Sequence, residues 1–253
     1  MKRTAKSGEL TRTFGKRGWR LFIAWALVAL PIASFAAASL AFHKKKPPPP
    51  LGEILERMND SAKRLKTVSA NLEYTKVTVV VDDKSTEYGQ LFFQKGKNSA
   101  ILVNFQKPDP KVILFNLKQK KAEIYLPKSN QIQEYDVGKH SGLVEHFLLL
   151  GFGTEVGDLR KSYTIKLIGE EVLDGDTAAV LELTPRREEI AAQLTKVQLW
   201  VSEDSWIPAQ QKFFESDGDY LVARYTAVKT NRELPASTFR IPAPKGVKRV
   251  KMG

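Results

Sequence analysis

The chain has 253 residues, of which 42% are hydrophobic and 27% charged, and it carries a formal net charge of +12. This length and apolar fraction are sufficient for one large domain, or two small ones, with a proper hydrophobic core. The sequence contains no cysteine, which excludes disulfide bonds, a thiol nucleophile and a cysteine-linked lipid anchor.

The first forty or so residues have the composition of a bacterial secretion signal. Seven Lys or Arg residues precede an apolar run from Leu21 to about Phe35, and small residues occupy 36–41. A basic segment, an apolar segment and a small-x-small site are typical of a signal peptide, so we predict that residues 1–41 are removed after Ala41, with Ala38 as a second fitting site. The alternative is an uncleaved anchor, because residues 21–42 could cross a hydrocarbon core of ~30 Å.

The next residues predict a spacer followed by one domain. Residues 42–50 include the sequence HKKKPPPP, which favours a semi-rigid polyproline II tether. We expect residues 51–253 to form a single domain that opens with an amphipathic helix over Leu51–Lys66. Apolar side chains recur at helical spacing in that range at Leu51, Ile54, Leu55, Met58, Ala62 and Leu65.

After Val68 the apolar residues alternate with polar ones, which is the pattern of β-strands. The phase changes near Lys76, where we predict a bulge. Further strand-like runs, separated by turn sequences such as Asp174-Gly175, lie at 87–94, 100–106, 112–117, 122–126, 131–137, 163–168, 178–183, 195–201, 209–214 and 220–229. About eleven strands in an antiparallel meander are therefore expected.

One interruption of the strand pattern runs from Gly138 to Ser162. Leu143, Val144, Phe147, Leu148 and Leu149 predict a short apolar helix that ends at Gly151, and Val156 and Leu159 predict a second turn. Several strands carry large apolar residues on both faces, which indicates a covered or curled sheet. Such a sheet with helices over it can enclose an apolar cavity, and a core filled by side chains is the alternative.

Residues that could support catalysis or bind a metal do not form a convincing site. The three histidines are His43, His140 and His146, and the last two do not share a helical face. Paired acidic residues at 203–204 and at 217 and 219 fall at predicted hairpin turns, where solvated carboxylates are common. The sequence therefore predicts a binding protein, not an enzyme, with no cofactor and no metal.

Two basic runs, Lys118–Lys121 and Lys245–Lys251, raise the question of nucleic acid. Predicted export argues against that partner, and we interpret the runs as a solvated hairpin tip and a solvated tail. Attraction to anionic lipid headgroups stays open, since each basic residue near such a surface contributes about 1 kcal/mol.

Several segments resemble the periplasmic outer-membrane lipoprotein carriers of the LolA-like family, with the LolA/LolB/RseB type of fold. The likeness extends over essentially all of residues 51–250, and the segments that carry it are 65–70 (LKTVSA), 89–95 (GQLFFQK), 124–127 (IYLP), 199–201 (LWV), 207–211 (IPAQQ), 217–219 (DGD) and 239–247 (FRIPAPKGV). The resemblance implies a mainly β, α+β fold, namely an unclosed antiparallel β-barrel with helices as a lid. It also implies a periplasmic monomer that shuttles the acyl chains of lipoproteins from the inner to the outer membrane, between an inner-membrane release complex and an outer-membrane acceptor.

The resemblance also implies roles for particular residues. In the family an arginine after the second strand helps to hold the lid and governs release, and the nearest equivalent here is Lys95, which keeps the charge but loses the bidentate guanidinium. We expect cavity contacts from the lid helices at Leu55, Met58, Phe147, Leu148 and Leu149. The candidate contacts from the sheet, about half of which should line the cavity, are Phe92, Leu102, Phe115, Tyr125, Trp200 and Phe213.

Three alternatives stay open at this point. The protein could carry another lipid, such as a glycolipid or phospholipid. It could be a regulatory sensor of the same fold, although such sensors usually carry a second domain for which a chain ending at Gly253 has no room. It could also be a scaffold whose helices pack permanently on a filled core.

Overall fold

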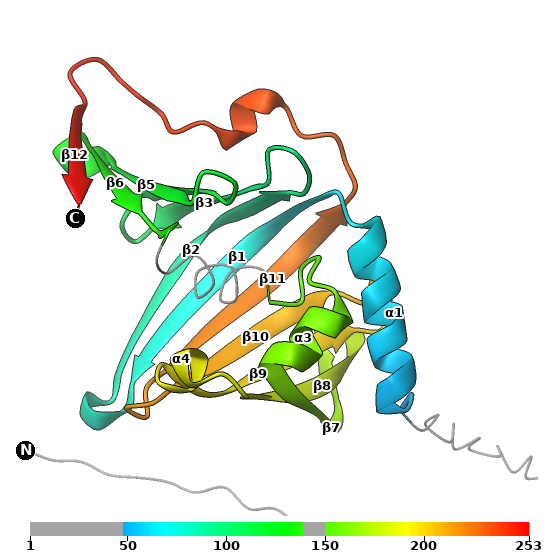
Figure 1. Ribbon diagram of the computed structural model, residues 1–253. Coiled ribbons are helices and arrows are strands. Elements are labelled where there is room, and N and C mark those ends of the chain that lie inside the picture. The colour runs from blue at the N-terminus through cyan, green and yellow to red at the C-terminus, as the bar shows by residue number, and fades with distance from the viewer. Residues whose placement is uncertain (1–47, 139–149, 253) are drawn as a thin grey trace, which may run out of the picture. The chain divides into compact units, whose positions relative to one another are not determined.

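A twelve-stranded sheet dominates the computed structural model, which describes residues 48–138 and 150–252 (Figure 1). The strand order is β12-β6-β5-β4-β3-β2-β1-β11-β10-β9-β8-β7, and the sheet does not close into a barrel. The strands are β1 Thr67–Thr78, β2 Asp83–Gln94, β3 Ala100–Lys107, β4 Lys111–Asn116, β5 Lys121–Leu126, β6 Gln131–Asp136, β7 Tyr163–Leu173, β8 Asp176–Pro185, β9 Leu194–Ser202, β10 Pro208–Glu215, β11 Tyr220–Thr230 and β12 Lys248–Met252.

The eleven strands predicted from alternation and turn residues correspond to β1–β11, and the unclosed, curved sheet is confirmed. The predicted bulge near Lys76 is wrong, because β1 and β2 pair in one unbroken register from Thr67 to Thr78. The irregularity lies instead between β1 and β11, opposite Ser69 and Asn71. There β11 contains an extra residue, and Ala227 adopts a left-handed conformation with φ of 50°.

Helix α1 spans Leu51–Arg64, two residues shorter than predicted. It buries Ile54, Leu55, Met58 and Ala62, and its acidic first turn and basic last turn suit the helix dipole. The predicted second turn forms α3, Val156–Ser162. The sheet curls around the helices, which lie on its concave side (Figure 1). They pack there against β8, β9 and Phe213 of β10.

Part of the opposite face, over β2–β4, is covered by the segment that follows β11. Phe239 and Ile241 of this segment pack on Ala100, Leu102 and Leu114. In Figure 1 this segment runs above β3, β5 and β6 before it enters β12. Strands β3 and β4 carry apolar side chains on both faces because both faces are covered. One face packs in the concave interior, and the C-terminal segment covers the other.

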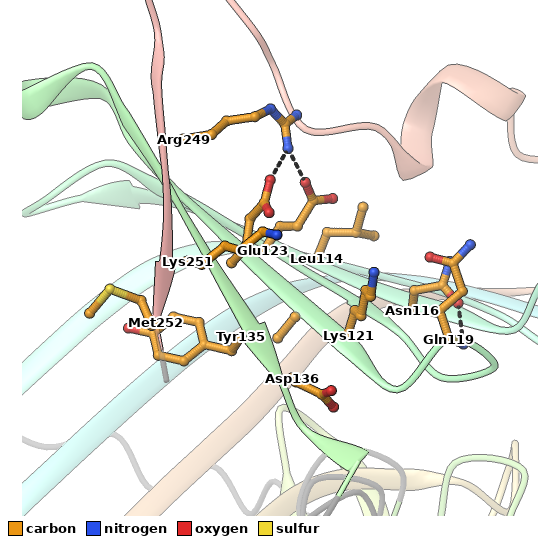
Figure 2. Close-up of a pocket in the computed structure, with 12 residues that line it drawn as sticks. Leu114, Asn116, Gln119, Lys121, Glu123, Tyr135, Asp136, Arg249, Lys251 and Met252 are labelled. Atoms are coloured by element: carbon orange, nitrogen blue, oxygen red, sulfur yellow. Dashed lines mark hydrogen bonds and ion pairs between the residues drawn. The ribbon is translucent and has the colours of Figure 1, made fainter.

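Strand β12 was not predicted, and the sequence indicated only a solvated basic tail in its place. It pairs parallel to β6 over Lys248–Met252, so the sheet is mixed and not purely antiparallel. The guanidinium of Arg249 donates to Glu123 at 2.8 Å and also to Glu134, above a polar pocket of about 450 Å³ (Figure 2). The strand is nevertheless exposed along most of its length, as a basic edge strand should be.

The predicted signal peptide, most of the tether and the helix around 143–149 lie outside the described residues. The described residues belong to one compact unit, 46–253. None of the helices in 48–138 and 150–252 is long and apolar enough to cross a membrane.

Candidate binding cavity

An apolar cavity of about 300 Å³ opens on the concave side of the sheet, between β1–β4 and β10–β11. This volume lies at the small end of the range of ~300–1,000 Å³ that is usual for ligand pockets. We call this space the apolar cavity, and its apolar walls are Leu72, Leu91, Val103, Phe105, Ile113, Phe115, Phe213, Leu221 and Ala223. Tyr74, Tyr225, Gln211, Glu87 and Lys111 complete the lining.

Strand register brings these side chains together. Leu91 faces Val103 across the β2–β3 pair, and Val103 faces Ile113 across β3–β4, which makes one continuous apolar row. Gly89 precedes Leu91 on the same face. A Cβ at Gly89 would lie 2.3 Å from the Asn104 carbonyl oxygen, so only glycine lets β3 approach β2 this closely.

A buried polar chain closes one side of the apolar cavity. The Tyr225 hydroxyl donates to Gln211 Oε1 at 2.8 Å, and the Gln211 amide donates to the Leu150 carbonyl. Burial raises the pKa of Tyr225 above its ordinary value, so the phenol keeps the proton that it donates. Phe152 packs edge-on against the Tyr225 ring, with centroids 4.8 Å apart. The loop that leads into α3 is thereby fixed to the sheet.

An ion pair lies at another border of the apolar cavity. Lys111 Nζ is 2.8 Å from Glu87 Oε1 and lies 4.8 Å from the centre of the Phe105 ring. Burial, followed by the nearby carboxylates of Glu215 and Glu87, raises the pKa of Tyr74 to about 12. Lys111 and Glu87 thus neutralise each other at this border of the apolar cavity.

Lys95 connects the helix α1 to the loop before α3. Its Nζ donates to the Ala62 carbonyl at 3.2 Å and to the Gly153 carbonyl at 3.3 Å. The Ala62 carbonyl belongs to the last turn of α1, where the helix dipole favours a positive charge. Lys95 therefore contacts two elements that cover the concave face, and its part in release stays a prediction.

The other predicted contact residues lie in four different environments. Phe115 and Phe213 line the apolar cavity. Leu55 and Met58 are buried between α1 and the sheet. On the face opposite the cavity lie Phe92, Leu102, Tyr125 and Trp200. Phe147, Leu148 and Leu149 lie outside the described residues.

Sequence reasoning missed most of the cavity walls because it selected large, mostly aromatic residues without knowing which face of each strand is concave. Leu91 and Phe92 point to opposite faces of the sheet, as do Val103 and Leu102. An error about which face is concave therefore exchanges every wall residue of a strand for its neighbour. The indole of Trp200 instead donates to Glu171 at 2.8 Å on the outer face. Gly89 was the available signal, because a glycine inside a strand marks a close approach of backbones on that face.

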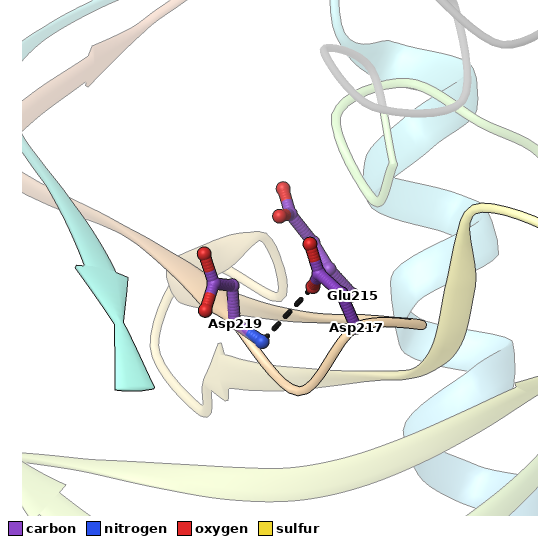
Figure 3. Close-up of side chains that lie close together, drawn as sticks. All are labelled: Glu215, Asp217 and Asp219. Carbon is purple, nitrogen blue, oxygen red and sulfur yellow. Dashed lines mark hydrogen bonds between the residues drawn. The ribbon is translucent and has the colours of Figure 1, made fainter. Parts of the chain in front are cut away.

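The acidic residues at the β10–β11 turn form the one cluster of three or more possible metal ligands among the residues that the structure describes. Carboxylate oxygens of Glu215, Asp217 and Asp219 lie within 4.8 Å of one another (Figure 3). Asp219 accepts a hydrogen bond from the Val79 N–H, and Asp217 accepts one from the Asp219 N–H. Two of the three carboxylates therefore already have a structural role, because each accepts a backbone hydrogen bond.

Comparison with known proteins supports the fold. An uncharacterized conserved protein from Thermus thermophilus superposes with a TM-score of 0.51 and 14% identity, over 79% of this chain and 98% of that one. MucB superposes with a TM-score of 0.50 and 14% identity, over 76% of this chain and 62% of that one. A LolA superfamily protein from Nitrosomonas europaea also matches, with 17% identity over 75% of this chain and 97% of that one, at a TM-score of 0.37.

The LolA-like fold expected from the sequence is confirmed. Residues 97–235, more than half of the chain, match a protein-family model whose description reads "Uncharacterized protein", and the chain belongs to that family. An uncharacterized protein from Methanocaldococcus jannaschii is 23% identical over 201 residues, which make up 79% of this chain. The chain spans about half (54%) of the length of that curated relative.

Proposed function

We propose that this protein binds the acyl chains of a lipid or lipoprotein in the apolar cavity. The observation that carries this proposal is the row of Leu91, Val103 and Ile113 facing an open space on the concave side of a covered sheet. Each methylene that leaves water for such walls contributes about 0.8 kcal/mol. The chemistry of the lining suits hydrocarbon, and we propose binding without catalysis.

The covering elements supply a route for entry and release. Lys95 joins α1 to the Gly153 loop through two carbonyl hydrogen bonds, and Arg57 of α1 lies 5.0 Å from the centre of the Trp206 ring. Contacts of this kind are modest, each contributing about 0.5–1.5 kcal/mol. These polar contacts add little to the burial of Ile54, Leu55 and Met58, which holds α1 on the sheet. We therefore propose that an acyl chain enters through a local shift at the contact between Lys95 and the Gly153 loop, while α1 stays in place.

The predicted secretion signal gives this binding a place in the cell. We propose that the exported protein acts in the periplasm and moves lipoproteins from an inner-membrane release complex to an outer-membrane acceptor. A carrier of another lipid would use the same cavity and differ only in its cargo.

A matched pair of variants tests the cavity. Ile113→Trp places a larger side chain in the apolar cavity, whereas Val112→Trp places it on the opposite face of the same strand, where Val112 packs against the C-terminal segment. We expect Ile113→Trp to weaken binding of a long-chain monoacylglycerol at least tenfold, measured by displacement of Nile red, and Val112→Trp to retain it. Circular dichroism would confirm that both variants are folded. Equal affinity in the two variants would contradict the proposal.

A further inference from the structure

A second pocket, of about 670 Å³, adjoins the apolar cavity along the strand direction. On β2, Phe93 of this pocket follows Leu91 of the cavity by two residues, and Leu117 likewise follows Phe115. Two residues of strand span about 7 Å, so the two spaces follow one another on the same face. Phe152 joins them, because it lines the second pocket and packs against Tyr225 of the cavity.

The second pocket, which we call the basic pocket, has apolar walls and a cationic rim. Its apolar walls are Phe93, Leu117 and Phe152, and its rim carries Lys95, Lys97, Lys118 and Arg187 against the carboxylates of Glu155 and Asp158. The cations come from the β2–β3 turn, the β4–β5 turn and the segment before α4, Glu188–Ala191.

Part of this charge has no acidic partner. Asp158 is paired with Lys161 at 2.8 Å, and Arg187 with Glu189 at 2.6 Å. Lys95 donates to two carbonyls, which do not cancel its charge. Within residues 48–138 and 150–252, no carboxylate lies within ion-pair distance of Lys97 or Lys118. The basic pocket therefore differs from the other polar border of the cavity, where Lys111 is neutralised by Glu87.

We propose that the ligand is an anionic amphiphile whose phosphate or carboxylate head group lies in the basic pocket, near Lys97 and Lys118, with its hydrocarbon in the apolar cavity. This inference rests on the proposed function and names the class of its ligand. Ammonium groups bind phosphate as point charges through hydrogen bonds that are stronger than neutral ones. The charges of the two borders fix the orientation of the ligand. Among the described residues that line them, Lys111 is paired with Glu87, whereas Lys97 and Lys118 in the basic pocket have no carboxylate within ion-pair distance.

The test compares two lipids that differ only in the head group. Monopalmitoylglycerol phosphate and monopalmitoylglycerol each displace Nile red from the wild-type protein, and we expect the phosphate to bind at least tenfold more tightly. Lys97→Gln with Lys118→Gln should remove most of this preference and leave the affinity for monopalmitoylglycerol unchanged. The preference should also shrink at high salt, because exposed charges are screened.

The control variant also removes two positive charges, but at a site away from the basic pocket. Lys76→Gln with Lys84→Gln alters the other end of the β1–β2 hairpin, whose register places Lys76 beside Ser85 and Val77 beside Lys84. We expect this variant to retain the wild-type preference. Equal affinity of the wild type for both lipids would overturn the inference alone, whereas failure of both lipids to bind would overturn the proposed function. Inorganic phosphate should not displace the phosphate lipid at equal concentration, and displacement would show a site for free phosphate instead.

Discussion

Gln211 shows how a single polar residue can organise the wall of an apolar space. Its side chain is only 1% exposed, yet both ends of the amide are occupied, one by the Tyr225 hydroxyl and the other by the Leu150 carbonyl. Buried polar groups cost little free energy while they are paired and much more when one partner is removed. The Gln211 amide is therefore one of the contacts that hold the loop over the cavity, together with the packing of Phe152 on Tyr225.

Replacing Gln211 with leucine tests that contact. The change leaves the Tyr225 hydroxyl and the Leu150 carbonyl without their partner, and each unsatisfied buried group costs about 1–3 kcal/mol. We expect the free energy of unfolding, measured with urea, to fall by about 2–4 kcal/mol. Gln210→Leu, at the partly exposed neighbouring position, is the control and should change it little. An unchanged value for Gln211→Leu would contradict this account of the loop.

Tyr74 gives the protein a predictable response to high pH. Its folded pKa of about 12 lies above the ordinary value of 10.0, so between these values the unfolded chain loses a proton that the folded protein keeps. The stabilisation is present below pH 10 and is lost as the pH rises toward 12. One such tyrosine lowers the free energy of unfolding by about 1.4 kcal/mol per pH unit in this window.

Tyr74→Phe should remove the contribution of Tyr74 to the fall in the free energy of unfolding with rising pH. Urea unfolding at several values between pH 10 and 12 measures it, with Tyr88→Phe, at a tyrosine that is 49% exposed, as the comparison. Tyr163, whose burial raises the pKa to about 12, and Tyr225, whose pKa burial also raises, would maintain part of the slope in both variants. A slope in Tyr74→Phe identical to that of the wild type would show that Tyr74 is not held in its neutral form by the fold.

At the scale of elements, the local pattern predicted strands well and their surroundings poorly. The strands β1–β11 alternate in the sequence and end at turn residues, and both signals are local. The strand β12 has neither signal. It is held by its pairing with β6, which brings together residues more than a hundred positions apart and so leaves no local pattern in the sequence. The same limit applies to the cavity. Trp200 and Phe213 look equally suitable in the sequence, and only the pairing of β8–β10 places them on opposite faces.

The contribution of β12 can be measured by ending the chain after Val247. This truncation exposes the edge of β6 and removes the ion pairs of Arg249, which are individually weak at an exposed surface. We expect a loss of about 1–2 kcal/mol in the free energy of unfolding, together with a tendency of β6 edges to pair between molecules. Sedimentation velocity would detect that association. A truncated protein that stays monomeric and equally stable would show that β12 is dispensable.

At the scale of the whole molecule, the predicted signal segment determines whether the domain can diffuse. Cleavage after Ala41 would free a protein with the lead HKKKPPPP after Phe42, whereas retention would limit the domain to the reach of its tether. N-terminal sequencing of protein purified from the cell envelope should therefore begin at Phe42. A start at Met1 would contradict the diffusing carrier and favour an anchored receiver.

The concave side of the sheet is where the fold and the proposed function meet. The apolar cavity and the basic pocket follow one another along the strands, and Lys95 links two of the elements that cover them. We propose that together they hold an acyl ligand. The sequence predicted the curved, covered sheet but not the basic pocket, because Lys118–Lys121 was interpreted as a solvated hairpin tip. Several predicted contact residues lie on the outer face instead, because the phase of each strand is set by its neighbours.

Mass spectrometry of the lipid extracted from natively purified protein tests the central claim most directly. The wild type and Val112→Trp should both carry acyl-chain species, and Ile113→Trp, purified in the same way, should carry far less. A wild-type protein that is consistently empty, or an Ile113→Trp protein loaded as fully as the wild type, would contradict the assignment of the apolar cavity as the lipid-binding site.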